Sequence, residues 1–208
     1  MTLRSATRRI GGIVLAAGES RRMGRNKLLL PLDGEPLVRR ACRRGLAAGL
    51  DPLIVVLGHE SERVQQALAG LDCHCILNAD VGGPMSSSLH CGLAALPADA
   101  EGAVIMLADM VNVTEHMLRT MLLSAQTSTA LLVCSRYAET LAPPVLFRRA
   151  LFDELYAASG EHCGKAVVEH HREHAIYVTR NLCRSTAVMT DTHYYWNACY
   201  IDCLLIFI

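Results

Sequence analysis

The chain has 208 residues, of which 51% are hydrophobic and 19% are charged, and its formal net charge is zero. A chain of this length and apolar content can bury a full core, so we expect a single domain over residues 1–208. Basic residues crowd the first 44 positions and suit an anionic ligand there, but they lack interleaved aromatics and the rest of the chain is acidic, which disfavours nucleic acid as a partner.

Short β-rich runs alternate with helical stretches along the chain. In chain order we predict strands at 12–17, 53–57, 74–77, 103–107, 130–134 and 175–178, and helices at 36–48, 61–69, 87–96, 115–124 and 148–158. This alternation predicts a three-layer α/β domain in which helices cover both faces of a mostly parallel, Rossmann-like sheet. Ligands bind such sheets at the carboxyl ends of the strands, and the segments after residue 17, before residue 86 and at residue 109 all fall on that edge.

The first predicted strand leads into a loop rich in small and cationic residues. Gly18 and Gly24 can adopt backbone angles that bulky residues resist, which would turn amide N–H groups toward phosphate oxygens. The spacing is not that of a Walker A loop or of the dinucleotide-binding pattern. The loop is therefore predicted to bind phosphate, and the cations available to neutralise it are Arg21, Arg22, Arg25 and Lys27.

Two further positions on the same edge carry polar side chains. Asp109 ends an apolar strand and can hold Mg²⁺, which needs few carboxylates because phosphate oxygens and water complete its shell. The alternative, that Asp109 caps the next helix, is weaker because Asn112 and Thr114 can do so. Ser86 precedes a helix, where it can either cap the helix or help its free N–H groups to bind a nucleotide.

The pattern Leu-Ala-Ala-Gly-x-Ser-x-Arg-Met-Gly-x-x-Lys at residues 15–27 resembles the signature of the MobA-like nucleotidyltransferases. Within that group it looks most like molybdenum cofactor cytidylyltransferase. The resemblance continues at 28–37, 85–93 and 107–110, covers a core over residues 11–178, and leaves 179–208 as a tail. It implies a nucleotide site formed by Leu15, Ala16, Ala17, Gly18, Ser20, Arg22, Gly24, Lys27 and Ser88. We add Ser86, from its place before a helix, and Arg21, as a looser candidate from its charge.

The same resemblance implies how the site would work. Arg22 and Lys27 would stabilise charge during transfer, and Asp109 together with Asp191 would hold Mg²⁺. Ala17 looks like the cytidylyl version of the motif, and its methyl group narrows a base pocket in favour of a pyrimidine. We therefore expect CTP as the donor, molybdopterin as the acceptor and Mg²⁺ as the cofactor.

Two alternatives remain open at this point. One is a guanylyl, sugar-phosphate or methylerythritol-phosphate nucleotidyltransferase, because the loop and Asp109 would serve any triphosphate. The other is a catalytically weak chaperone that handles the cofactor for a molybdenum hydroxylase partner. It is suggested by Pro84 and His90, which stand where relatives commonly have Gly and Arg.

The composition of the termini and the cysteine pattern indicate the cellular compartment of the protein. Nine cysteines without a regular framework, and no evident secretory leader, favour reduced thiols in a cytoplasmic protein. The apolar run at 200–208 is too short to cross a bilayer core of about 30 Å. We therefore expect no membrane partner.

Two short patterns imitate metal sites. Residues 170–174 read His-His-Arg-Glu-His and match the H-x-x-E-H spelling of a class of zinc proteases. Because no distal third ligand is evident, we interpret them as the polar end of a helix beside the strand at 175–178. Cys73-His74-Cys75 is a weaker pattern, and we interpret its cysteines as ordinary partly buried thiols.

Overall fold

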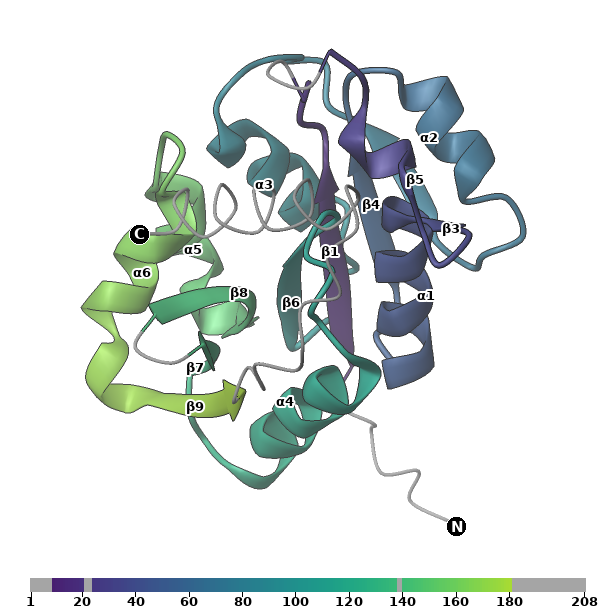
Figure 1. Cartoon of the computed structure of the whole chain (residues 1–208). Coiled ribbons are helices and arrows are strands. Elements are labelled where there is room, and N and C mark those ends of the chain that lie inside the picture. The colour runs from purple at the N-terminus through teal and green to yellow at the C-terminus, as the bar shows by residue number, and fades with distance from the viewer. Residues whose placement is uncertain (1–8, 21–23, 138–139, 181–208) are drawn as a thin grey trace, which may run out of the picture.

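A seven-stranded sheet forms the centre of the molecule (Figure 1). The computed structural model describes residues 9–20, 24–137 and 140–180. Six strands run parallel and β8 runs against them, so the predicted mostly parallel sheet is confirmed. The spatial order is β5 (His74–Leu77), β4 (Leu53–Leu57), β1 (Ile10–Ala16), β6 (Gly102–Leu107), β8 (Thr140–Arg148), β7 (Leu132–Tyr137) and β9 (Ala175–Arg180).

Helices cover both faces of this sheet, which confirms the predicted three-layer α/β fold. On one face α1 (Leu37–Ala48) packs on β1 and β4, α2 (Ser61–Ala67) contacts α1 and β4, and α4 (Glu115–Thr127) packs on β7, β8 and β9. On the other, α3 (Met85–Ala94) packs on β1 and β4 and contacts α5 (Phe152–Ala157) and α6 (Cys163–His170). Short elements complete the fold: the 3-10 helices η2 (Lys27–Leu29), η3 (Arg149–Leu151) and η4 (Arg172–His174), and the hairpin of β2 (Pro31–Leu32) and β3 (Glu35–Pro36).

The core lies between the central strands and the helices on either face. Every residue of β1 is buried, as expected for a parallel strand covered on both sides. A glycine lets α3 approach β1 closely: a Cβ at Gly92 would lie 2.4 Å from Cγ2 of Ile13. This close contact fixes the position of α3, whose first turns face the carboxyl edge of the sheet.

Besides the short hairpin and 3-10 helices, the sequence-based prediction lacks two longer elements, β8 and α6. The antiparallel strand β8 contains Pro143 and Pro144, which cannot donate ladder hydrogen bonds and therefore argue against a strand. The backbone of β8 pairs with β7 on either side of the prolines and with β6 after them, and β7 side chains bind the proline carbonyls: Ser135 Oγ donates to Pro144 at 2.6 Å and Tyr137 donates to Pro143 at 3.1 Å. Helix α6 was also missed, and the helix predicted at 148–158 is a 3-10 turn, η3, followed by the shorter α5.

Within the described residues, no helix is both long and apolar enough to cross a membrane.

Candidate active site

A cavity of about 260 Å³ opens at the carboxyl edge of the sheet, where the sequence pattern places its ligand. Its walls come from the loop after β1, the segment between β5 and α3, the end of β6 and the loop between α5 and α6. The lining residues are Leu15, Ala16, Ala17, Gly18, Glu19, Ser20, Lys27, Leu28, Asp80, Gly82, Gly83, Met85, Ser88, Leu107, Asp109 and Glu161.

The loop after β1 differs in detail from its predicted conformation. Gly24 has a φ of 63°, which suits glycine, but Gly18 does not lie in the left-handed region. Ser20 takes a φ of 52°, and its hydroxyl accepts a hydrogen bond from the Lys27 amide at 3.1 Å. Gly18 lines the cavity, and a Cβ there would meet no atom within 4 Å. Gly24 therefore shapes the loop, whereas Gly18 leaves space in the cavity.

Lys27 and Asp109 come from separate elements and form an ion pair between Nζ and Oδ2. Lys27 begins η2, which Asn26 caps by accepting a hydrogen bond from the Leu28 amide. Asp109 follows β6, and its side chain is only 6% exposed. A cation and a carboxylate from two predicted motifs thus lie together in one cavity.

A hydrogen-bond network around Asn78 places the serines of α3. The Asn78 side chain donates to Ser88 Oγ at 3.0 Å and accepts from Ser87 Oγ and from the Asp80 amide, each at 3.0 Å. Asn78 is 3% exposed, so these bonds are shielded from water. Ser88 reaches the cavity from this network.

Ser86 and His90 make structural contacts instead. Ser86 is not among the residues that line the cavity: its amide donates to the Gly160 carbonyl at 3.2 Å, and its hydroxyl accepts from the Gly160 amide at 3.1 Å. His90 Nε2 lies 3.0 Å from the Leu155 carbonyl. These contacts attach α3 to α5 and to the loop between α5 and α6.

Three predicted site residues, Arg21, Arg22 and Asp191, lie outside the described residues. Three acidic residues that we did not predict, Glu19, Asp80 and Glu161, line the cavity. Asp80 could have been found, because it closely follows a predicted strand at the ligand edge. Glu161 gave no signal in the sequence, since its position depends on how α5 and α6 dock.

The thiols of the Cys73-His74-Cys75 pattern lie in a separate hollow. The buried Cys42 thiol donates a hydrogen bond that lowers the pKa of Cys73 to about 7, whereas burial raises the pKa of Cys75 to about 11. The cysteines in the described part of the chain are free thiols.

Comparison with known proteins agrees with this architecture. The family model of the MobA-like NTP transferase domain matches residues 12–175. The purine catabolism protein PucB of Bacillus subtilis is 30% identical over 160 residues, which are 72% of this chain and 76% of PucB. The crystal structure of Rv0371c from Mycobacterium tuberculosis H37Rv superposes with a TM-score of 0.78 and 27% identity, covering 93% of this chain and 98% of that one.

Two further relatives match over shorter regions. The bifunctional protein GlmU of Kineococcus radiotolerans is 46% identical over 99 residues, 45% of this chain and 20% of GlmU. A probable molybdenum cofactor guanylyltransferase of Opitutus terrae is 35% identical over 102 residues, 49% of this chain and 48% of that protein. The matched region thus spans a fifth of one relative and about half of the other.

Proposed function

The chain belongs to the MobA-like NTP transferase family, a family of nucleotidyltransferases, and from this premise we propose that it transfers CMP from CTP to molybdopterin and releases pyrophosphate. The observation that carries the proposal is the cavity in which Gly18, Ser20, Lys27, Ser88 and Asp109 meet. The cavity offers space for phosphates beside the loop, a cation that can neutralise their charge and a buried carboxylate that can hold a metal ion. Transfer of a nucleotide from a triphosphate requires all three.

In the proposed reaction an oxygen of the acceptor's terminal phosphate attacks the α-phosphorus of the nucleotide. A new P–O bond forms, the bond between the α- and β-phosphates breaks, and pyrophosphate leaves with the electron pair. Lys27, and by resemblance Arg22, would offset the charge that develops on the phosphate oxygens. No covalent intermediate on the protein is needed.

The residues of the cavity fit a divalent cation. Among the described residues that line it, the carboxylates Glu19, Asp80, Asp109 and Glu161 outnumber the single cation Lys27, and a divalent cation would offset this excess of negative charge. Asp109 would hold Mg²⁺, with Asp191 as a second proposed ligand. The ion, when bound, supplies charge neutralisation to the phosphates. A solved structure of Rv0371c, 28% identical to this chain, is a complex with manganese.

The choice of base rests on Ala17, whose methyl group at the cavity wall favours a pyrimidine by narrowing the space available. GTP is the second candidate, because the relative from Opitutus terrae is a probable guanylyltransferase. Thermal shifts measured with the four nucleoside triphosphates and Mg²⁺ separate these two. A largest shift with CTP supports the proposal, and a largest shift with GTP replaces it with the guanylyl reaction.

The central experiment measures pyrophosphate release for each nucleotide, with and without molybdopterin, in the natural protein and in Lys27→Ala and Asp109→Ala. We expect release only when CTP, Mg²⁺ and molybdopterin are all present, and strongly reduced release in both variants. Undiminished release in the variants would refute the site. Tight molybdopterin binding without any release would instead support the alternative of a chaperone for a molybdenum hydroxylase.

A further inference from the structure

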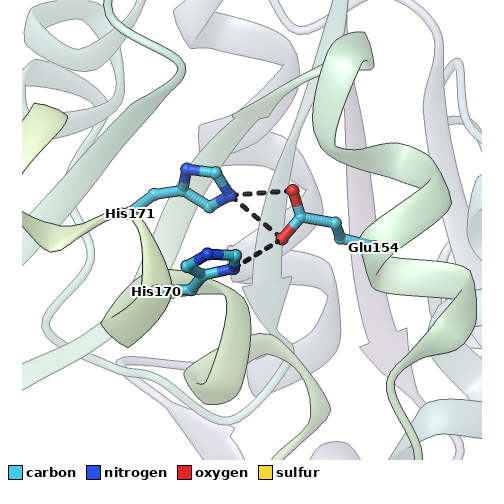
Figure 2. A group of neighbouring side chains, drawn as sticks. All are labelled: Glu154, His170 and His171. Atoms are coloured by element: carbon cyan, nitrogen blue, oxygen red, sulfur yellow. Dashed lines mark hydrogen bonds and ion pairs between the residues drawn. The ribbon is translucent and has the colours of Figure 1, made fainter.

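Three potential metal ligands gather between helix α5 and the end of helix α6, away from the cavity at the sheet edge. Glu154 lies on α5, His170 is the last residue of α6 and His171 follows it (Figure 2). The Nε2 atom of His171 lies 2.8 and 3.0 Å from the two carboxylate oxygens of Glu154, and Nδ1 of His170 lies 3.2 Å from Oε2. One ligand atom from each residue falls within 4.8 Å of the other two.

The arrangement is set by packing rather than by chance contact of long side chains. The neighbours of Glu154 in α5 include Leu155, which is fully buried, and α6 is anchored by the buried Val167 and Val168. The two imidazole rings lie 4.6 Å apart at an interplanar angle of 34°, and both direct a nitrogen at the same carboxylate. The helices therefore hold the three groups near each other before any ion binds, which lowers the cost of binding.

Two imidazole nitrogens and one carboxylate oxygen form a donor set that selects borderline transition-metal ions rather than Mg²⁺. The present spacings are those of hydrogen bonds, and an ion would replace the shared protons as the link between the groups. Glu154 adds a distal carboxylate to His170 and His171, but this cluster is not the H-x-x-E-H site, whose two histidines would be His170 and His174. His174, the last residue of that spelling, is not a member of the cluster.

We propose that Glu154, His170 and His171 bind a divalent transition-metal ion such as Zn²⁺, with water completing its shell, and that this ion clamps α5 to α6. The clamp acts on the loop between these helices. In that loop Gly160 exchanges two hydrogen bonds with Ser86, and Glu161 lines the cavity. Metal binding by these three residues is therefore expected to reduce the mobility of the loop that forms one wall of the cavity. The metal ion itself would not contact a ligand in the cavity.

The test uses the full chain, freed of metal by a chelator that is then removed. Co²⁺ is titrated in and followed by its visible absorption, which distinguishes nitrogen and oxygen ligands from the thiolates of the cysteines. His170→Ala and Glu154→Gln remove ligands, and His174→Ala is the matched control. The His170 side chain is 73% exposed, so its removal leaves the fold intact.

We expect one Co²⁺ bound per chain at this site in the natural protein and in His174→Ala. Affinity should fall about 10-fold or more in the other two variants, the size of loss seen when the surroundings of a metal are disturbed. Zn²⁺ at 100 times its Kd should raise the Tm of the natural protein by about 5 to 10 °C, but not that of His170→Ala.

Equal Co²⁺ affinity in the natural protein, His170→Ala and Glu154→Gln would overturn the proposal. So would the absence of saturable binding, in which case the three residues form only a hydrogen-bonded ion-pair cluster.

Discussion

Substitution of Gly18 by alanine separates the role of this residue in ligand binding from any role in folding. Gly18 lines the cavity, its φ lies outside the left-handed region, and a Cβ there would meet no atom within 4 Å. The folded protein therefore accepts the methyl group without strain. Alanine also reduces the freedom of the unfolded chain, which adds about 0.4 to 1 kcal/mol to the free energy of unfolding.

The cost of Gly18→Ala should appear in nucleotide binding. The methyl group occupies space that phosphate oxygens need in order to approach the loop amides. Loss of one hydrogen bond to a charged group costs about 1.5 to 3 kcal/mol, which weakens binding about 10- to 150-fold. The predicted gain in Tm is at most about 4 °C, because 1 kcal/mol shifts the Tm of a chain of this size by about 2 to 4 °C.

Calorimetric titration with Mg²⁺ and CTP, without acceptor, measures the affinity, and thermal unfolding measures the Tm. Gly92→Ala is the contrasting control, since its Cβ would lie 2.4 Å from Ile13 Cγ2 and 3.3 Å from Val56 Cγ2. Overpacking there costs about 1 to 3 kcal/mol and should lower the Tm by about 2 to 12 °C. Unchanged nucleotide affinity in Gly18→Ala would refute the phosphate-binding role of the loop.

Three further predictions concern single side chains. Asp109→Asn keeps the shape of the side chain but removes its charge, so Mg²⁺-dependent pyrophosphate release should fall about 100- to 1,000-fold; an undiminished initial rate would contradict a metal-binding role. Ser86→Ala removes the acceptor for the Gly160 amide and should lower the free energy of unfolding in urea by about 1 kcal/mol, with nucleotide affinity affected less than in Gly18→Ala. The Cys73 thiolate accepts a hydrogen bond from Cys42, so the rate of Cys73 alkylation by iodoacetamide should rise with pH around a midpoint of about 7. The rate is measured as the difference from the Cys73→Ser variant. A midpoint near the ordinary value of 9.0 would rule out that hydrogen bond.

The central strands and the meeting of Lys27 with Asp109 could be predicted from the sequence. Parallel strands buried on both faces appear as continuous apolar runs, and β4 and β5 begin and end where they were predicted. Because the carboxyl ends of such strands share one edge, a loop after the first strand and an aspartate after β6 had to lie close together.

The structure of the second half of the chain was harder to predict from the sequence, for physical reasons. Pro143 and Pro144 disguise β8, whose backbone pairs with β7 on either side of them and with β6 after them, while β7 side chains bind the proline carbonyls in between. The roles of Ser86 and Glu161 follow from the docking of α5 and α6 on α3. This is tertiary packing, which no periodic pattern of residues in the sequence predicts. Of the two glycines predicted to need unusual backbone angles, Gly24 has a positive φ and Gly18 does not, because both fit the same loop pattern and only the folded chain tells them apart.

The ion pair between Lys27 and Asp109 has a thermodynamic consequence for how ligands enter. In the ligand-free protein each charge neutralises the other, at side-chain exposures of only 21% and 6%. On the proposed roles of these residues, a triphosphate arriving alone would draw Lys27 away from the buried Asp109 carboxylate, and a metal ion arriving alone would draw Asp109 away from Lys27. The two ligands together would supply a new partner to each charge. We therefore expect the two binding events to be coupled with positive cooperativity, so that each ligand raises the affinity for the other by the same factor.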